Sequence, residues 1–460
     1  MDLWPHQESA IEFLLRMRVG AVVHDMRLGK TRTAIETVRC VRRGYDGEVP
    51  TLVCCPNPVR LVWPEEIQKF DPESEIVVID DTKLSQLKGR QCMPSWVIIN
   101  YDKLRLCIKT LLQYQWLAII SDECQKVKNL DAQVTRAFRQ LRAPYRFALS
   151  GTPFDKPEEA WSIYDWLRPG YLGAHRAFLW RYTIQEDVFV GRGGRDGFVK
   201  MIVGYKHTEE LKEKLAVLTH RQSRFGVRGM PDRVGIARYV PMNVEQSRVY
   251  REIRENFRAR LMEDESEVVR NPNGIFIALQ QITSTTRTLW EQDESGKLDA
   301  LEGMLEEDLG NGTQAIIWCK FIATIEALKQ RLSLRKLTMA TIYGDTSAEA
   351  RRTTIHLFQQ GEIKVLVANP AVAGLGLDLS SASIEYFVDL PLSTSEYIQA
   401  CDRGVSMQKS EPVAIVHLLS EGTVDVRLYR LLQQKLTRLE DTLGGGILTG
   451  LSKDEILGLI

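Results

Sequence analysis

The sequence lacks the features that mark membrane, exported and metal-stabilised proteins. No apolar run approaches the roughly 20 residues that span a bilayer, and the start, MDLWPHQESA, has neither a basic segment nor an apolar signal region. Its 8 cysteines form no CxxC pair and no Cys/His cluster, which argues against structural zinc and a disulfide framework. We therefore expect reduced thiols, a cytoplasmic compartment and no membrane partner.

The sequence also lacks net charge, because 60 Lys and Arg residues balance 60 Asp and Glu residues. This balance removes the simplest argument for a nucleic-acid partner, although a neutral protein can carry a basic cleft. With 460 residues, of which 44% are hydrophobic and 26% charged, the chain has enough material for two or three domains.

Short apolar stretches rich in β-branched residues recur along the chain, separated by helix-length amphipathic segments. The first series is GAVVHD, TLVCCP, WVIIN, LAIISDE and RFALSGT. The second series begins after residue 296 and is AIIWCK, TIYGD, KVLVAN, EYFVDL and AIVHLL. Such runs are typical of buried parallel strands, so the sequence predicts an α/β fold with two similar lobes.

The segment between the two series has a different character. Residues 186–205 alternate apolar and polar positions around a Gly-rich stretch, Gly191–Gly197, which predicts a β-hairpin. Residues 242–290 are charged and helical in period, interrupted by Asn271-Pro272-Asn273-Gly274. The predicted domains are an N-terminal lobe over 1–240, a helical linker or protrusion over 241–296, a C-terminal lobe over 297–445 and a tail over 446–460.

The most chemically specific segment is VVHDMRLGKTRTAIETV, in which an apolar strand runs through a tight turn into a helix. Backbone N–H groups and the dipole at such a helix start attract phosphate oxygens. Lys30 would reach the β and γ phosphates, and the Thr31 hydroxyl would ligate Mg²⁺. The strict GxxxxGK[ST] pattern fails because His24 stands where the first glycine belongs, so an ordinary strand–helix turn is the alternative interpretation.

A second sequence element, which is acidic, supports the nucleotide site. In LAIISDECQKVKN an apolar strand ends in Asp122-Glu123, where one carboxylate can hold Mg²⁺ through water and its neighbour can polarise the attacking water. The alternative interpretation of Asp122-Glu123 is an acidic helix N-terminus, which is common in proteins. The two elements occur in the expected order, about 90 residues apart, which favours a site for ATP and Mg²⁺.

At this point the sequence resembles the SWI/SNF-type ATPases of helicase superfamily 2, from about residue 3 to about residue 435. The opening motif is LWPHQESAIEFLL, TLVCCPNPVRLVWPEEIQKF resembles motif Ia, and DECQKVKN is close to motif II of that family. RFALSGTPFDKPEEAWSIYDWLRPGYLG carries motif III. The second lobe continues with QAIIWCKF, YGDTSAEARR, KVLVANPAVAGLGLDLSSA and YIQACDRGVSMQKSEPVAIVHLLSEGTVDVRLYRLLQQK, which resemble motifs IV to VI and their flanking segments.

The resemblance implies two tandem RecA-like lobes that use ATP and Mg²⁺. It assigns catalysis to Lys30, Asp122, Glu123 and the arginine finger Arg403, and metal binding to Thr31 and Asp122. It assigns nucleotide contacts, with Gln7 reading adenine, to Gln7, Gly29, Lys30, Thr31, Arg32, Gly376, Asp378 and Gln399. Ser150 and Thr152 would relay the nucleotide state to the other lobe.

The resemblance also implies a DNA partner, held through its phosphates without sequence preference. It places along the DNA track Pro56, Asn57, Tyr101, Lys103, Lys128, Lys320 and Gly374, although each lysine also fits a solvated surface charge. The compact chain looks more like monomeric annealing or branch-migration helicases, including phage ones, than like a nucleosome remodeller. The Gly191–Gly197 hairpin, with Arg192 and Arg195, would engage branched DNA or be a surface loop.

Two departures from the family pattern leave alternatives open. Ser406 replaces the second motif VI arginine, followed by Met407-Gln408-Lys409, and a serine cannot supply a delocalised positive charge. Either hydrolysis runs with Arg403 or with compensation by Lys409 or Arg352, or the chain is a nucleotide-gated DNA-binding module with little turnover. An RNA helicase is disfavoured by the motif forms. Arg27 replaces a glycine that is common in this family.

Overall fold

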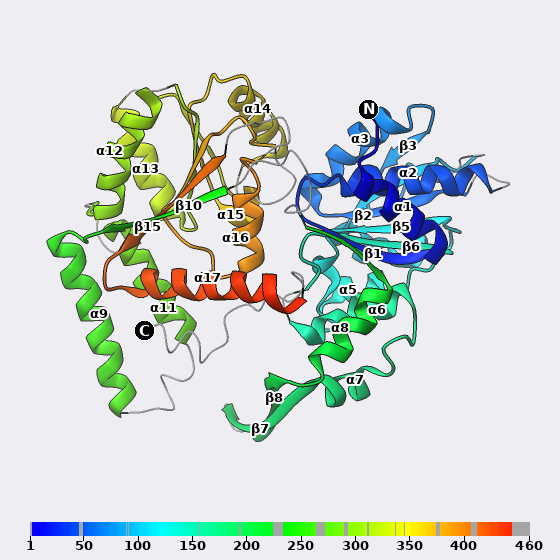
Figure 1. Cartoon of the computed structure of the whole chain (residues 1–460), viewed down its shortest axis with the longest axis horizontal. Coiled ribbons are helices and arrows are strands. Elements are labelled where there is room, and N and C mark those ends of the chain that lie inside the picture. The colour runs from blue at the N-terminus through cyan, green and yellow to red at the C-terminus, as the bar shows by residue number, and fades with distance from the viewer. Residues whose placement is uncertain are drawn as a thin grey trace. The chain divides into compact units, whose positions relative to one another are not determined.

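The computed structural model describes residues 2–45, 49–88, 90, 92–154, 156–192, 195–223, 233–263, 272–288, 293–310, 312–335, 337–344, 346–373, 378–405 and 412–443. The chain divides into two compact units, and the division falls between strands β9 and β10. Each unit is built on its own parallel β-sheet (Figure 1).

The first unit contains a seven-stranded sheet in the order β3-β4-β2-β5-β6-β1-β9. The strands are β1 (Val19–His24), β2 (Thr51–Cys55), β3 (Ile76–Val78), β4 (Trp96–Asn100), β5 (Ala118–Asp122), β6 (Tyr145–Ser150) and β9 (Thr219–Gln222). The helices are α1 (Pro5–Met17), α2 (Lys30–Arg43), α3 (Val62–Phe70), α4 (Tyr101–Leu111), α5 (Gln133–Phe138), α6 (Ala160–Leu167), α7 (His175–Tyr182) and α8 (Thr208–Val217). Short 3-10 helices are η1 (Asn57–Leu61), η2 (Cys124–Val127) and η3 (Pro157–Glu159).

Helices cover both faces of the first sheet, which explains why its central strands are apolar throughout rather than alternating. Leu14, Ala34 and Trp63 of α1, α2 and α3 pack on one face, whereas Leu104 and Ile163 of α4 and α6 pack on the other. Figure 1 shows α2 and α3 on the opposite side of the strands from α5 and α6. The sheet is therefore a buried layer, and its strand ends are where polar side chains can gather.

The second unit contains a six-stranded parallel sheet in the order β10-β15-β14-β11-β13-β12. The strands are β10 (Arg233–Val240), β11 (Ala315–Trp318), β12 (Met339–Ile342), β13 (Val365–Ala368), β14 (Ile384–Phe387) and β15 (Val413–Ser420). The helices are α9 (Val244–Glu263), α11 (Pro272–Ser284), α12 (Gly296–Gly310), α13 (Ile322–Leu334), α14 (Ala348–Gln359), α15 (Pro370–Ala373), α16 (Thr394–Cys401) and α17 (Val424–Leu443), with the 3-10 helix η5 (Thr286–Thr288). The two parallel sheets with flanking helices confirm the predicted α/β fold.

The region around the expected domain boundary differs from the prediction. The sequence places residues 233–240 in the first lobe, but β10 pairs with β15 over its whole length and is the edge strand of the second sheet. The sequence also predicts a linker or protrusion over 241–296. In the structure, α9 and α11 contribute Tyr250 and Phe276 to a core cluster of the second unit, so these helices are packed parts of it.

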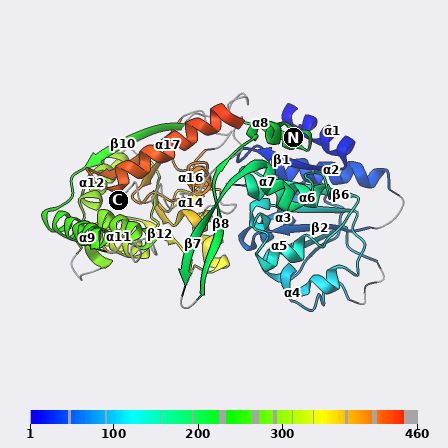
Figure 2. The ribbon, with the colours of Figure 1, turned by 90° about the horizontal axis from the view of Figure 1, so that it is seen from below.

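The predicted hairpin is present. Strands β7 (Thr183–Arg192) and β8 (Arg195–Tyr205) pair antiparallel, with an irregularity between Ile184 and Gln185. The ribbon leaves the body of the first unit in two perpendicular views (Figures 1 and 2). No helix among the described residues is long and apolar enough to cross a membrane.

Candidate nucleotide site

The loop between β1 and α2 is a tight turn that contains two residues in the left-handed backbone region. Arg27 and Gly29 have φ values of 64° and 70°, and α2 begins at Lys30. A side chain at position 29 would be obstructed, because a Cβ there would lie 2.1 Å from Nε2 of Gln7. The first amides of α2 therefore open onto a compact loop, the arrangement that suits phosphate oxygens.

Lys30 lies over this loop. Its Nζ donates hydrogen bonds to the carbonyl oxygens of His24 at 2.8 Å and of Asp25 at 3.1 Å. Its positive charge lies near enough to Asp122 to oppose in part the effect of burial, which raises the pKa of that carboxyl. The sheet explains this proximity: β1 and β5 flank β6, and Val23 is in register with Ser150 as Asp122 is with Leu149.

Asp122 and Glu123 are both buried where β5 ends. Asp122 Oδ2 accepts a hydrogen bond from Trp63 Nε1 at 2.9 Å, and Oδ1 accepts one from the Glu123 amide at 3.1 Å. Burial, and then the charge of Glu123, raise the pKa of Asp122 well above its usual range. Two adjacent buried carboxylates with one nearby ammonium leave an excess of negative charge that a divalent cation would offset.

These oxygen groups fit Mg²⁺, which takes one or two protein ligands and completes its shell with water and substrate phosphates. Asp122 and the half-buried Thr31, the second residue of α2, supply such ligands. Among the described residues there is no cluster of three or more His, Cys, Asp or Glu side chains that would hold a metal ion without a substrate.

A chain of hydrogen bonds connects motif II with motif III. Gln125 Nε2 donates to Glu123 Oε2 at 2.6 Å, and Ser150 Oγ donates to Gln125 Oε1 at 2.7 Å. The Thr152 amide in turn donates to Ser150 Oγ at 2.9 Å. The sequence singles out Ser150 and Thr152 but misses Gln125, which joins them to the carboxylate of Glu123.

Tyr101 does not lie where the sequence predicts it. It is placed among the DNA contacts by resemblance, but in the structure it is only 6% exposed. Its hydroxyl donates to the Asp122 carbonyl oxygen at 2.7 Å and lies 2.9 Å from Ser121 Oγ. Tyr101 therefore supports the end of β5 from inside the core, as Trp63 does from the other side of the sheet.

His24, which interrupts the phosphate-loop pattern, is part of a histidine cluster. It is 0% exposed, and its Nε2 lies 2.9 Å from His220 Nδ1 on the neighbouring strand β9. The His6 ring stands edge-on to it at 5.4 Å, and His6 Nε2 lies 2.9 Å from the Leu28 carbonyl oxygen. Burial first, and then the charge of Lys30, lower the pKa of His24 to about 2, so His24 is neutral at pH 7.

The side chains of Gln7 and Arg32 make contacts with other residues of the first unit. Gln7 is buried, its Oε1 accepts from the Trp4 amide at 2.9 Å, and its Nε2 donates to the Gly29 carbonyl oxygen at 3.2 Å. Gln7 thus ties the start of α1 to the phosphate loop. The Arg32 guanidinium lies over the Phe70 ring at 4.7 Å and donates to the Asp2 carbonyl oxygen at 3.0 Å.

The expected motif V and VI residues belong to the second unit. Arg403 is 4% exposed and is the second residue after the end of α16, and Gln399 is half-buried within that helix. Asp378 accepts a hydrogen bond from the Ser380 amide at 3.1 Å, so its carboxylate closes a local turn. Gly374, Gly376, Ser406 and the Met407-Gln408-Lys409 segment lie outside the described residues.

The remaining DNA-contact candidates are in mixed settings. Asn57, the residue after Pro56, accepts a hydrogen bond on its Oδ1 from Asn100 Nδ2 at 2.9 Å. Lys103 Nζ lies 3.9 Å from Asp80 Oδ1. Lys128 pairs with Glu159 at 3.0 Å. In the second unit, Lys320 donates to Gln280 at 2.9 Å, and burial lowers the pKa of its ammonium.

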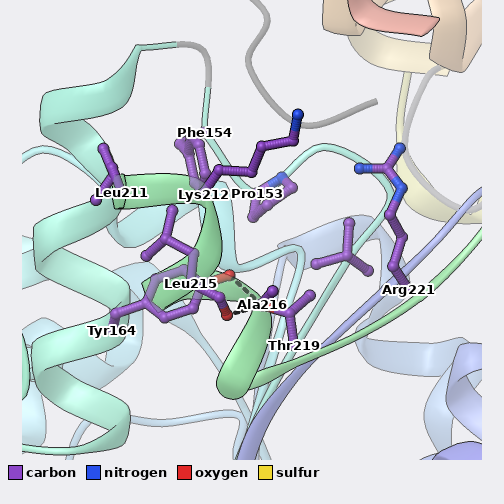
Figure 3. Close-up of a pocket in the computed structure, with 10 residues that line it drawn as sticks. Pro153, Phe154, Tyr164, Leu211, Lys212, Leu215, Ala216, Thr219 and Arg221 are labelled. Atoms are coloured by element: carbon purple, nitrogen blue, oxygen red, sulfur yellow. Dashed lines mark hydrogen bonds between the residues drawn. The ribbon is translucent and has the colours of Figure 1, made fainter. Parts of the chain in front are cut away.

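A small apolar pocket lies next to motif III (Figure 3). Pro153 and Phe154 form one side, and Leu211 and Leu215 of α8 form another. The Tyr164 hydroxyl and Thr219 Oγ1 are hydrogen-bonded at 2.6 Å, as the dashed line marks. The pocket lining includes neither the phosphate loop nor the carboxylates of Asp122 and Glu123, so the pocket is not the nucleotide site.

Comparisons with known proteins agree with this geometry. The SNF2-related domain model matches residues 6–288, and the helicase conserved C-terminal domain model matches residues 296–408. The uncharacterized ATP-dependent helicase MG018 of Mycoplasma genitalium is 23% identical over 96% of this chain and 42% of its own length. The putative ATP-dependent helicase/translocase YwqA of Bacillus subtilis is 23% identical over 95% of this chain and 48% of its own length.

The DNA excision repair protein ERCC-6 of Homo sapiens is 25% identical over 95% of this chain and 32% of its own length. A solved structure, the SWI2/SNF2 ATPase core of Sulfolobus solfataricus in complex with dsDNA, is 24% identical, covers 100% of this chain and 97% of that chain, and has a TM-score of 0.45. The chain thus spans less than half the length of these curated relatives.

Proposed function

The chain belongs to the SNF2-related domain family, and from this premise we propose that it is an ATP-driven DNA translocase that remodels duplex or branched DNA. The observation that carries the proposal is that Lys30 follows β1 while Asp122 and Glu123 lie at the end of β5, at the same edge of the first sheet on either side of β6. A phosphate loop and a buried acidic pair at that edge are what phosphoryl transfer from ATP needs.

In this proposal the described residues of the first unit have distinct tasks. Lys30 leaves the loop carbonyls for the β and γ phosphates, and Glu123, held by Gln125, orients the attacking water. Mg²⁺, held by Thr31 and Asp122, would neutralise charge on the phosphates when bound. The Gln125–Ser150–Thr152 chain would carry the state of the nucleotide into motif III.

The finer assignments depend on the family resemblance. Arg403 would complete the site as an arginine finger, and Gln7, Asp378 and Gln399 would contact the nucleotide. Repeated closing and reopening of the two lobes would move the protein along DNA held by its phosphates. The long β7–β8 ribbon supports a role at DNA branches, in branch migration, fork regression or annealing.

The deciding experiment measures ATP turnover by the whole chain without DNA and with single-stranded, duplex, forked and four-way DNA. We expect stimulation by duplex or branched DNA, larger at low salt because phosphate contacts release counterions. Turnover that no DNA stimulates would contradict a translocase and favour a nucleotide-gated DNA-binding module. Stimulation by RNA alone would favour an RNA helicase.

Two variants test the site assignment in the same assay. Lys30→Ala should abolish nucleotide binding, because the ammonium that pairs with the phosphates is lost. Glu123→Gln should keep binding but stall turnover by a factor on the order of 10² or more, since only the water-orienting carboxylate changes. Normal turnover by Glu123→Gln would show that motif II is assigned wrongly.

A further inference from the structure

A buried carboxylate with no task in the proposed function lies in the second sheet. Glu385 belongs to β14, a strand between β15 and β11, and is 0% exposed. A carboxylate in such a place is strongly destabilising unless hydrogen bonds compensate for the lost water. What Glu385 binds therefore indicates what it does.

Each oxygen of Glu385 holds one donor. Trp318 Nε1, from the neighbouring strand β11, donates to Oε2 at 2.8 Å. The Gly404 amide donates to Oε1 at 3.0 Å. Gly404 directly follows Arg403, so one half of the carboxylate is fixed by the sheet and the other half anchors the backbone of motif VI.

The backbone at Gly404 approaches Glu385 so closely that a larger residue would displace the carboxylate. A Cβ at position 404 would lie 2.5 Å from Oε1 of Glu385. On the other side of Arg403, Asp402 Oδ1 lies 3.0 Å from Arg233 Nη1, at the start of β10. Arg403 is thus flanked by two residues that are each tied to a strand of the sheet.

We propose that Glu385 is a positioning residue for Arg403, on which it acts through the Gly404 amide. The proposal rests on the proposed function, because it takes Arg403 as the finger of the ATP site. An arginine that acts in a transition state must be held in one orientation, and backbone anchors on both sides reduce its freedom.

The hydrogen bond between Glu385 and the Gly404 amide should depend on pH, because the carboxyl of Glu385 titrates. Burial raises the pKa of Glu385 to about 7, against the hydrogen bonds from Trp318 and Gly404. The charged groups that face it are Arg233, which lowers this pKa, and Asp402, which raises it. The Cys401 thiol of α16 also lies within its electrostatic reach.

The ionised carboxylate accepts from both donors. In the protonated acid, the hydroxyl oxygen is a poor acceptor, and the bond to the carbonyl oxygen is also weaker because the acceptor is neutral. The anchor on Gly404 therefore strengthens as the pH rises through about 7.

The test is Glu385→Gln in the full-length chain, with DNA-stimulated turnover measured between about pH 6 and about pH 8. We expect kcat to fall about tenfold at the upper end, the worth of one charge-assisted hydrogen bond, with little change in KM for ATP. The wild-type to variant ratio should rise with pH through about 7, because titrations common to both proteins cancel in it.

Tyr386→Phe is the matched control on the same strand. Its hydroxyl donates to Asp308 of α12 rather than to the 402–404 segment, so the pH profile of the variant should match the wild type. Thermal unfolding and nucleotide binding check that the glutamine variant is folded. If it is not, Glu385→Met, which fills the site without charge, should show the same loss of turnover and of pH dependence.

The Arg403→Ala background separates this inference from the proposed function. Arg403→Ala should itself lower kcat by a factor on the order of 10³, and Glu385→Gln should then have no further effect. If Arg403→Ala turns over normally, the finger assignment fails. If Arg403→Ala is impaired but Glu385→Gln matches the wild type at every pH, or adds its full effect to Arg403→Ala, the positioning role of Glu385 is overturned.

Discussion

The phosphate loop places two residues in left-handed backbone, and only one of them is a glycine. Arg27 has a φ of 64°, close to the 70° of Gly29. A residue with a Cβ carries a strain of roughly 1–2 kcal/mol in that region. The structure thus gives a backbone reason for the glycine that is common at this position in the family that the sequence resembles.

We expect Arg27→Gly to be more stable than Arg27→Ala by about 1 kcal/mol, the reverse of the usual order of these two residues. Both variants lose the guanidinium, so its contacts cancel in the comparison and the backbone term remains. Urea unfolding followed by circular dichroism measures the difference. An alanine variant at least as stable as the glycine variant would show that the loop relaxes out of the left-handed region.

His24 makes the first unit sensitive to acid. Its pKa is about 2 in the folded state and 6.5 in an unfolded chain. Below about pH 6.5, therefore, His24 is protonated in the unfolded state but stays neutral in the folded state. Stability is therefore lost as the pH falls, by about 1.4 kcal/mol per pH unit for this group. The bond between His24 Nε2 and His220 Nδ1 requires that one of these two facing nitrogens carries a proton and the other does not.

His24→Gln should remove this loss while keeping a polar partner for His220. The variant's unfolding free energy should fall less steeply than that of the wild type between about pH 6 and about pH 5, by about 1.4 kcal/mol per unit. Carboxylate titrations are common to both proteins and cancel. Parallel pH profiles would mean that His24 takes up its proton without unfolding.

At the scale of elements, the sequence predicted the buried apolar strands inside each sheet and the β7–β8 hairpin, but it missed the edge strands β3, β9 and β10. The run LAIISDE marks β5 because both faces of that strand are covered. Strand β9 reads THRQ and has no apolar signal, whereas β3 reads IVV and is apolar but only 3 residues long; both lie at the edges of the first sheet. Only tertiary pairing makes them strands.

Strand β10 shows a second limit of the sequence. Its residues, RVGIARYV, mix apolar and charged positions without strict alternation, and such a segment carries no information about which sheet the strand joins. Its partner β15 lies about 180 residues further along the chain. The sequence did not indicate the roles of Trp63, Gln125 and Glu385 for the same reason: these roles come from side-chain contacts with other elements of the fold.

At the scale of the whole molecule, the two units have separate cores. Leu14, Trp63 and Phe147 share one cluster in the first unit, while Phe276 and Trp318 share another in the second. Domains with their own cores unfold in separate transitions unless a large apolar interface couples them. We therefore expect calorimetry of the DNA-free chain to resolve two transitions.

A non-hydrolysable ATP analogue should shift the transition of the first unit, because Lys30, Thr31 and the acidic pair all belong to that unit. At a ligand concentration near 100 times Kd the stabilisation is about 2.7 kcal/mol, which for a domain of this size raises Tm by roughly 5–10 °C. Lys30→Ala should leave both transitions in place and abolish the shift. A shift confined to the other transition, or one that survives in Lys30→Ala, would place the nucleotide away from the phosphate loop. A shift of the second transition that appears only when DNA is added, and disappears in Arg403→Ala, is the result expected if the second unit joins the nucleotide site through that arginine.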